Sequence, residues 1–575
     1  MAAKPTRQNS ESRTITNAGV AAILHRYAAV LHAGGEDGFK IKAYRRAAET
    51  IERMPGDVAG LVAQGNDLQN LPGIGKAISS VIEEIVRTGK FQRLDETLAP
   101  MPPGMVELIS RPLLDPKRVQ SIYKKLGIHT LKELAERLEL GAIRESFGDR
   151  MELHIRQGLD SRPRMLLRKA DQLAGPIEAF LKSIPGVATV ERTGSLRRRQ
   201  ETVGDLSFLI SGSRPRDVFE RFSQFAKLEP GIGERNRRSF RLATGQVVTL
   251  QWAAKKTWGL ELVTATGAPA HLKELETRAR QKRISLSVKR LASMQVDASS
   301  ESSVYQAVGL PVIEPELREG RGEIRAAAQG CLPSLVRLAD LKGDLHMHTT
   351  ASDGGNTMLE MAEAARDLGY RYIAITDHSQ SLKLTNGLSE KRLLAQIREI
   401  DKLNARLDGI VILKSSEVDI LENGSLDYPP SVLKELDLTI CSIHSRFALD
   451  RQRQTERILR AMDNRYFNIL GHATGRLLLR RPGYDLDIER LVDHAKQVGC
   501  FFEINSNPNR LDLSDLHARL AKDKGVKIAI NTDAHSIAEL DFMAGGVDQA
   551  RRGWLEPGDV LNAAPLARLR KLLKR

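Results

Sequence analysis

The chain has 575 residues, too many for one hydrophobic core, so about two to five domains are expected. Its 87 lysines and arginines against 72 aspartates and glutamates give a formal net charge of +15, and it holds three cysteines. Three cysteines without a CxxC pair exclude a disulfide framework, and no apolar run reaches the roughly 20 residues that a membrane helix needs.

The positive charge is unevenly distributed. Lysine and arginine are in excess over the first 340 residues, whereas residues 341–575 are close to balance. A basic half joined to a neutral half suggests a polyanion-binding module attached to a second functional domain. The alternative is an ordinary basic surface exposed to solvent.

The first 330 residues are patterned as helices followed by a mixed region. Residues 17–50 predict helices that break at Gly34-Gly35, and further short helices are predicted up to about residue 160. A helix beginning at residue 164 then leads into three predicted strands, at 188–191, 206–210 and 247–252.

From residue 342 onward, short apolar runs alternate with helical stretches. Seven runs are predicted as strands, the first around Leu345 and the others at 372–376, 410–413, 438–443, 467–470, 501–504 and 527–530. This alternation predicts a parallel sheet, closed into a barrel, whose site lies at the carboxyl ends of the strands.

Polar residues of metal-ligand type follow these runs. Alone, each histidine is more often a core or surface residue than a ligand, but together they form a set too regular for chance. The candidate ligands are His346, His348, Asp353, His378, Glu417, His444, His472, Asp533 and His535. Imidazole and carboxylate without thiolate suit Zn²⁺, Mn²⁺ or Fe²⁺, and the set is large enough for two or three ions. Clustered ions of this kind activate water and hold phosphoryl oxygens.

These residues resemble the PHP (polymerase and histidinol phosphatase) family over residues 342–570. The matching motifs are Asp344-Leu345-His346-Met347-His348, Ile375-Thr376-Asp377-His378-Ser379, Ser442-Ile443-His444, Gly471-His472 and Thr532-Asp533-Ala534-His535. The resemblance implies a distorted seven-stranded α/β barrel with a trinuclear centre, in which the nine residues are ligands and Glu417 bridges two ions. It also makes Arg510 a candidate phosphate contact, against the alternative of a surface arginine.

The basic half resembles a DNA polymerase X core. Leu71-Pro72-Gly73-Ile74-Gly75-Lys76 is similar to a helix–hairpin–helix loop, in which Gly73 and Gly75 let backbone amides reach a DNA phosphate and Lys76 adds charge. The preceding segment, residues 39–48, is similar to the start of that polymerase family. Thr193-Gly194-Ser195-Leu196-Arg197-Arg198 and Gly204-Asp205 are similar to its nucleotide-binding turn and palm strand, which implicates Gly194, Ser195, Arg198 and Asp205.

This core departs from the family where polymerisation needs carboxylates. The family's paired aspartates appear as Asp205-Leu206-Ser207, and the third falls in Val248-Thr249-Leu250, so Asp205 alone remains. A pair of Mg²⁺ ions is therefore not expected in the palm. The second hairpin reads Pro112-Leu113-Leu114-Asp115-Pro116, without its glycines.

The predicted organisation is multidomain, with an α-helical domain, an α+β core and an α/β barrel. The predicted parts are a helix–hairpin–helix domain at 1–95, a fingers-like helical domain at 96–160, a degenerate nucleotidyltransferase palm at 161–255, a thumb-like domain at 256–320, a linker at 321–340 and a PHP domain at 341–575.

Three functions are compatible with these resemblances. The first is a metal-dependent DNA phosphoesterase, a 3′–5′ exonuclease or an enzyme processing 3′ ends or abasic sites in DNA repair, with a polymerisation-deficient core. The second is an active gap-filling polymerase with an accessory exonuclease. The third is a phosphatase of small phosphate monoesters. The intact ligand set favours the first and third, and the basic half favours the first. We expect DNA with gaps, damage or 3′ ends as partner, no membrane partner, and a cytoplasmic, nucleoid-associated location; the oligomeric state stays open.

Overall fold

The computed structural model describes residues 15, 17–53, 58–71, 73–109, 111, 114–159, 164–212, 214–223, 229–230, 236–242, 245–287 and 297–574. These fall into two compact units, one formed by Met1–Pro163 with Arg216–Thr249 and the other by Arg164–Pro215 with Leu250–Arg575. No helix among the described residues is long and apolar enough to cross a membrane.

The N-terminal residues form a helical domain. Its helices are α1 (Asn17–Gly34), α2 (Gly38–Arg53), α3 (Val58–Ala63), α4 (Lys76–Thr88), α5 (Gln92–Leu98), α6 (Pro103–Ile109), α7 (Pro116–Leu126), α8 (Leu131–Glu139), α9 (Ala142–Phe147) and α10 (Asp149–Leu159). The predicted break after α1 is confirmed, and Gly35 there adopts a left-handed φ of 79°. Apolar residues on the inner faces of these helices share one core, in which Tyr27 packs edge-on against Tyr44 and Phe91.

The segment after the helical domain begins the second unit. It consists of β1 (Met165–Leu166), α11 (Leu167–Ser183), β2 (Val187–Arg192), α12 (Gly194–Arg197), β3 (Thr202–Val203) and β4 (Asp205–Gly212). Strands β2 and β4 pair antiparallel, with Val190 opposite Ile210. The predicted strands at 188–191 and 206–210 are therefore confirmed. We call residues 164–212 the palm segment.

The next elements divide between the two units. α13 (Pro215–Phe222), β5 (Glu229–Pro230), β6 (Arg237–Arg241) and β7 (Val247–Trp252) include the third predicted strand, and β5 pairs antiparallel with β6. In the second unit, α14 (Trp258–Thr266), α15 (Pro269–Gln281), α17 (Glu301–Ala307) and α18 (Glu323–Ala328) follow. These four helices share a core around Leu275 and Tyr305.

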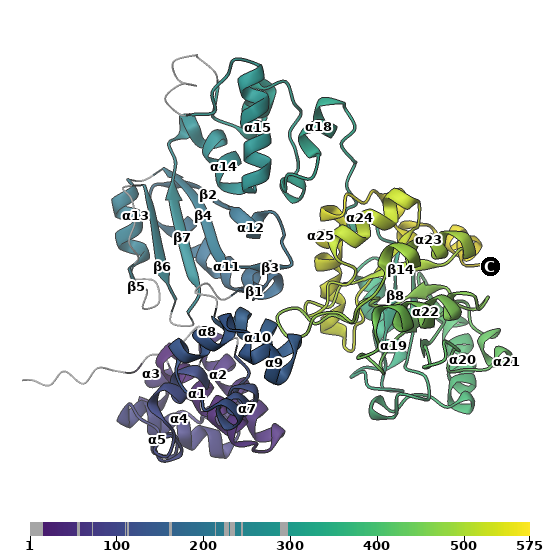
Figure 1. Ribbon diagram of the computed structural model, residues 1–575, viewed down its shortest axis with the longest axis horizontal. Coiled ribbons are helices and arrows are strands. Elements are labelled where there is room, and N and C mark those ends of the chain that lie inside the picture. The colour runs from purple at the N-terminus through teal and green to yellow at the C-terminus, as the bar shows by residue number, and fades with distance from the viewer. Residues whose placement is uncertain are drawn as a thin grey trace, which may run out of the picture. The chain divides into compact units, whose positions relative to one another are not determined.

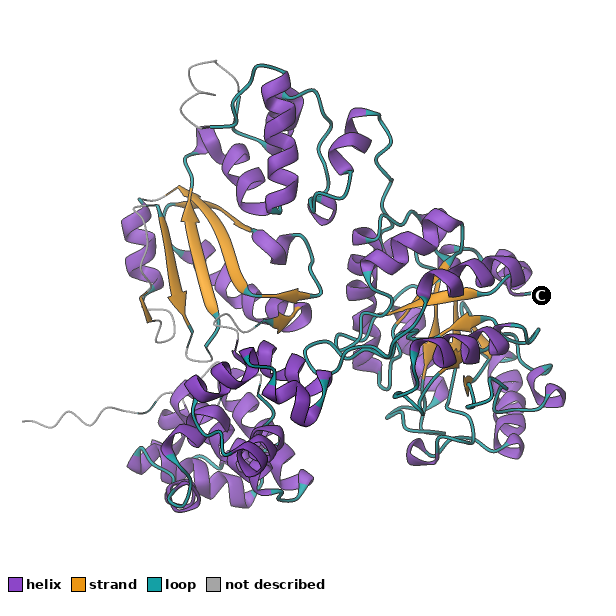
Figure 2. Cartoon of the chain, viewed as in Figure 1, coloured by secondary structure: helices purple, strands orange, loops and turns teal. Residues whose placement is uncertain are grey.

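The C-terminal domain contains eight short strands in two parallel sheets (Figure 2). One sheet has the order β10 (Val411–Lys414), β9 (Tyr372–Ile375), β8 (Gly343–Met347), and the other runs in chain order through β11 (Glu417–Asp419), β12 (Ile440–Ser442), β13 (Ile469–Leu470), β14 (Phe501–Asn505) and β15 (Ile528–Asn531). Single bridges join the two sheets: Met347 of β8 pairs with Ala534 after β15, and His378 after β9 pairs with Glu417 of β11. The α/β fold class is confirmed, with β11 added to the seven strands that the sequence predicted.

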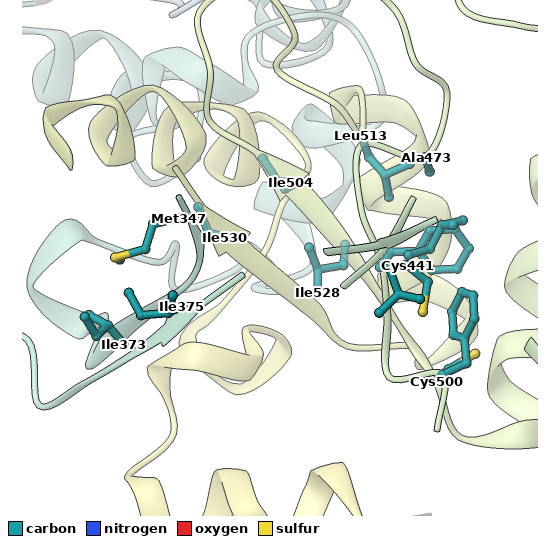
Figure 3. Close-up of a cluster of buried hydrophobic side chains, with 14 of the residues drawn as sticks. Met347, Ile373, Ile375, Cys441, Ala473, Cys500, Ile504, Leu513, Ile528 and Ile530 are labelled. Carbon is teal, nitrogen blue, oxygen red and sulfur yellow. The ribbon is translucent and has the colours of Figure 1, made fainter. Parts of the chain in front are cut away.

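Helices surround these strands (Figure 1). They are α19 (Met358–Asp367), α20 (Glu390–Asn404), α21 (Pro430–Leu433), α22 (Arg451–Met462), α23 (Ile488–Val498), α24 (Asp515–Lys524), α25 (Met543–Arg552) and α26 (Leu566–Leu573). Strand residues alternate between two buried clusters: Tyr372 and Ala374 belong to one. Ile373 and Ile375 belong to the other, which Figure 3 shows. Burial on both faces explains why the strands are continuously apolar in sequence.

Candidate metal centre

The ends of the strands bring the nine candidate ligands into one cluster. Three groups of side chains have ligand atoms within 4.8 Å of one another, and they share members. The groups are His348, Asp353, His378 and His535; His346, His348 and Asp533; and His378, Glu417 and His444. The ninth residue, His472, contacts the third group through Glu417, with its Nε2 2.8 Å from the carboxylate.

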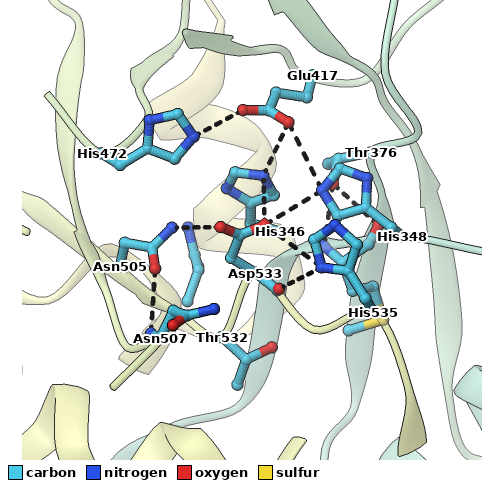
Figure 4. A network of polar contacts seen from close by, with 12 residues as sticks. His346, His348, Thr376, Glu417, His472, Asn505, Asn507, Thr532, Asp533 and His535 are labelled. Atoms are coloured by element: carbon cyan, nitrogen blue, oxygen red, sulfur yellow. Dashed lines mark hydrogen bonds and ion pairs between the residues drawn. The ribbon is translucent and has the colours of Figure 1, made fainter. Parts of the chain in front are cut away.

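Glu417 contacts histidines of this cluster through both of its carboxylate oxygens (Figure 4). Its Oε2 is 2.8 Å from His378 Nδ1, and its Oε1 is 3.3 Å from His444 Nε2. His346 and His348 approach Oε2 at 3.5 and 3.6 Å. Both oxygens of this one carboxylate therefore face histidines of the cluster, and Glu417 would be a ligand shared between neighbouring metal positions if ions were bound.

The other two carboxylates lie on either side of His348. Asp533 Oδ1 is 3.2 Å from His348 Nε2 and 3.5 Å from His346 Nε2. Asp353 Oδ2 is 3.5 Å from His535 Nε2 and 3.7 Å from His378 Nε2. Asp353 is the exposed member of its group, so this end of the cluster faces solvent.

The electrostatics of the cluster favour bound cations. Burial raises the pKa of Glu417, but His444 and His378 outweigh burial and hold that pKa well below its usual range. Burial lowers the pKa of His444, but the carboxylates of Glu417 and Asp419 outweigh it and raise the pKa to about 10. Buried carboxylates therefore stay ionised here because positive charge lies against them, a charge that divalent ions would supply.

The residues present fit such ions. Several buried ring nitrogens of the cluster make no hydrogen bond of acceptable geometry even where a carboxylate oxygen lies close, namely His346 Nε2, both nitrogens of His348, His378 Nδ1 and His472 Nδ1, and the same holds for Glu417 Oε2. Buried polar atoms are normally paired, and each unpaired one is unfavourable by about 1–3 kcal/mol. Nitrogen and carboxylate oxygen donors of this type match Zn²⁺, Mn²⁺ and Fe²⁺.

Further buried groups orient the histidines, and the sequence did not single out their role. Glu503 accepts from His346 Nδ1 at 2.8 Å and from the backbone amide of His472 at 2.8 Å. Asp419 accepts from His444 Nδ1 at 2.5 Å. These bonds leave Nε2 of His346 and His444 facing the cluster, as partners of metal-bound histidines do. The strand-end position of Glu503 was the signal that could have identified it.

Arg510 lies at the rim of the cluster. Its Nε is 3.5 Å from Asp533 Oδ2, and its side chain is 23% exposed. Asn505 donates to the same Asp533 oxygen at 3.0 Å. The guanidinium of Arg510 is thus partly exposed beside a carboxylate of the cluster, and its contact with a phosphate stays a prediction.

In the palm segment, the predicted site residues Asp205 and Arg198 already have side-chain partners. Ser207 Oγ donates to the remaining carboxylate, Asp205 Oδ2, at 2.6 Å. Arg198 is paired with Glu319 at 2.9 Å and donates to the Thr266 carbonyl at 2.7 Å. The guanidinium expected to bind nucleotide is thus already neutralised, while Gly194 takes a left-handed φ of 61° at the start of α12, followed by Ser195.

The first hairpin in the helical domain has the predicted form. Gly73 adopts a φ of 79° and Gly75 is the N-cap of α4, with open space around its Cα and no side-chain cap. Lys76 is exposed at the first turn. At the second hairpin, Asp115 caps α7 by accepting from the Arg118 amide at 3.0 Å. Pro112 and Leu113 of that motif lie outside the described residues.

Comparison with known proteins finds family matches in three parts of the chain. Family models match a helix-hairpin-helix domain at residues 15–91, a DNA polymerase beta thumb at 261–319 and a PHP domain at 344–507. The fold and these matches thus define a chain in which a helix–hairpin–helix domain and a polymerase-β-like thumb are joined to a PHP domain.

Comparison with individual relatives identifies the family to which the chain belongs. It is 37% identical over 568 residues to the DNA polymerase/3′-5′ exonuclease PolX of Bacillus subtilis (strain 168), covering 96% of this chain and 98% of the relative. The chain belongs to the PolX family. Probable phosphatases of Caldanaerobacter subterraneus and of Thermoanaerobacter sp. (strain X514) are each 33% identical over 36% of this chain, covering 80% and 82% of their own lengths.

Proposed function

We propose that this chain is a metal-dependent 3′–5′ exonuclease acting on DNA in repair, with a core that binds DNA but does not polymerise it. The observation that carries the proposal is the cluster of nine ligand-type residues centred on Glu417. The full-length match to a relative named as polymerase and 3′-5′ exonuclease supports DNA as the substrate. Processing of 3′ ends or abasic sites would use the same phosphoester chemistry.

The nine residues would hold two or three Mn²⁺, Zn²⁺ or Fe²⁺ ions, with Glu417 and Asp533 as central carboxylates. Bound ions of this kind make water nucleophilic near neutral pH and stabilise charge on phosphoryl oxygens. Glu503 and Asp419 fix the rings of His346 and His444 by accepting from Nδ1. Arg510 would bind a non-bridging phosphate oxygen and orient the scissile bond.

Loss of polymerisation is supported by the palm segment. Asp205 is engaged by the Ser207 hydroxyl, and Thr249 bonds Ser239 at 3.1 Å between hydroxyls. Among the described residues, every group of three or more potential ligands lies in the C-terminal domain. Hydroxyls replace carboxylates poorly as Mg²⁺ ligands, so the palm lacks the anions that two-metal catalysis needs.

Two other functions have an observation in their favour. The name of the Bacillus subtilis relative includes DNA polymerase, which favours an active gap-filling enzyme. The probable phosphatases match the C-terminal part of the chain, which favours hydrolysis of small phosphate monoesters. The excess of lysine and arginine over the first 340 residues, together with the open hairpin at Gly73 and Gly75, favours DNA over a small substrate.

One assay separates the three. Purified protein is given Mn²⁺ and a gapped duplex labelled at the 5′ end of the primer strand, with and without deoxynucleoside triphosphates. Stepwise shortening in both conditions supports the exonuclease. Extension with triphosphates would show an active polymerase, and an unchanged primer combined with hydrolysis of 4-nitrophenyl phosphate would point to the phosphatase. The Asp533→Ala variant controls for contaminating nucleases.

A further inference from the structure

A carboxylate of the palm segment reaches into the C-terminal domain. Glu201, just before β3, lies with its Oε2 2.7 Å from Nη2 of Arg476, which belongs to the loop after β13. The same oxygen is 3.4 Å from Gln549 Nε2, on α25. Glu201, Arg476 and Gln549 all lie in the second compact unit, and the Gln549 side chain is buried. Glu201 thus holds two side chains of the neighbouring domain.

Those two side chains hold one stretch of backbone. Arg476 Nε donates to the Arg510 carbonyl at 3.0 Å, and its Nη2 donates to the Leu511 carbonyl. Gln549 Nε2 donates to the carbonyls of Leu511 at 3.3 Å and Leu513 at 3.2 Å. The carboxylate and its two partners therefore form a clamp on residues 510–513.

The clamped backbone is one that local sterics do not favour. Leu511 has a φ of 40°, in a region that branched and bulky residues rarely occupy. Strained residues of this kind persist only where the surroundings over-determine them. The donors from Arg476 and Gln549 supply that constraint, and Glu201 in turn fixes the donors.

The clamped residues contact the candidate metal centre through Asn505 and Arg510. Asn505 and Asp512 exchange backbone hydrogen bonds of 2.6 and 3.2 Å, so the clamped residues are tied to the end of β14. From this same stretch, Asn505 and Arg510 both approach Asp533 Oδ2. A shift of the backbone at Arg510 would move the guanidinium away from the position where a phosphate would bind.

We propose that Glu201 is a positioning residue for phosphodiester hydrolysis in the C-terminal domain, acting through Arg476 on Arg510. This inference rests on the proposed hydrolase function. It assigns the palm segment a role in hydrolysis that is separate from DNA binding and from nucleotide chemistry. A misplacement of about 1 Å at a reacting centre is associated with losses of about 10²-fold, so a weakened clamp should lower kcat by about tenfold or more.

The test uses the full chain loaded with Mn²⁺ and bis(4-nitrophenyl) phosphate, a diester too small to need the DNA-binding half. Glu201→Ala and Glu201→Gln are compared with wild type and with Glu276→Ala. Glu276 is an exposed carboxylate on α15 that pairs with Arg280 one turn away, at 3.7 Å, and serves as a matched control. Metal content is measured for every variant.

We expect Glu201→Ala to lose about tenfold in kcat with unchanged metal content, Glu201→Gln to lose less because its amide oxygen still accepts, and Glu276→Ala to match wild type. Amide hydrogen exchange gives a readout independent of activity: residues 512 and 513 should exchange faster in Glu201→Ala alone.

A double-mutant cycle with Arg510→Ala separates positioning from general support. If Glu201 acts through Arg510, Glu201→Ala should have little further effect in the Arg510→Ala background. Additive losses, or an active wild type with an equally active Glu201→Ala, would overturn the inference while leaving the hydrolase intact. A wild type inactive on both the diester and DNA would instead overturn the proposed function.

Discussion

The metal centre and the palm segment both place an aspartate near the end of a β-strand, yet they differ in what surrounds it. Asp533 lies among imidazoles, a second carboxylate and Arg510. Asp205 has a serine hydroxyl as its hydrogen-bond donor. Whether a carboxylate can hold a metal ion therefore depends on the groups beside it. A single anion holds a metal poorly, whereas several buried donors without other partners hold it well.

The largest expected effect tests the first half of this comparison. The double variant His346→Ala/Asp533→Ala should lose most bound metal and lower DNA hydrolysis by more than about 10³-fold, because removal of one electrostatic element commonly costs about 10²–10³ in rate. Elemental analysis and the primer-shortening assay measure both. Metal content equal to that of wild type would remove the basis for the centre.

The second prediction tests the palm. Wild type should show little or no primer extension, at least about 10²-fold below what an intact carboxylate set would give, because two anionic ligands are missing. The measurement is primer extension with Mg²⁺ and triphosphates, beside a Ser207→Asp/Thr249→Asp variant that restores the charges. Robust extension by wild type that Asp205→Ala abolishes would show that the palm is active after all.

The third prediction compares the two hairpins of the helical domain. Asp115 caps α7, whereas Gly75 leaves the start of α4 open. Gly75→Asp should place a carboxylate where a DNA phosphate would bind, weakening duplex binding by about tenfold and lowering the salt slope of log K by about 1. Titrations at several salt concentrations measure both, with Gly89→Asp, at the far end of α4, as control. Unchanged binding would show that this hairpin does not contact phosphate.

The smallest effect concerns acid stability of the helical domain. His154 accepts from the Asp115 amide at 2.8 Å, and burial, assisted by Arg118, lowers its pKa to about 4. The imidazole of His154 therefore stays unprotonated in the folded state, whereas in the unfolded chain it binds a proton below about pH 6.5. The contribution of His154 to the free energy of unfolding is fully present above that pH. It is lost as the pH falls through about 4, and amounts to at most about 3 kcal/mol. Chemical denaturation of wild type and His154→Gln at pH 7 and pH 5 should show a smaller pH effect in the variant.

Much of the C-terminal domain was predictable because its signals are local. Strands buried on both faces appear as apolar runs, and polar residues that follow such runs gather at one end of a parallel barrel. The pattern predicts that His346, Glu417 and Asp533 share one site, and in the structure His346 contacts both carboxylates. The strand β11 was missed because only three residues, Glu417–Asp419, form it, and the first of them is polar.

The supporting contacts were not predictable, because they depend on how distant segments pack. Nothing in the sequence indicates that Glu201 meets Arg476, or that Arg198 is neutralised by Glu319. Glu503 and Asp419 were visible as acids, but their bonds to particular ring nitrogens follow only from side-chain positions. Chemistry-bearing residues can be found from pattern, whereas the residues that orient them require tertiary structure.

The spacing of the ligands along the chain has a consequence for biosynthesis. Two of the three groups of candidate ligands combine the first strand of the domain with the last: His535 completes the group of His348, and Asp533 completes the group of His346 and His348, both after β15. Closing such long loops is entropically unfavourable until the whole sheet is in place. A ribosome-bound chain that has not yet emerged to Asp533 therefore carries most of the candidate ligands without the complete centre, so full metal loading should be a late step that coincides with completion of the barrel.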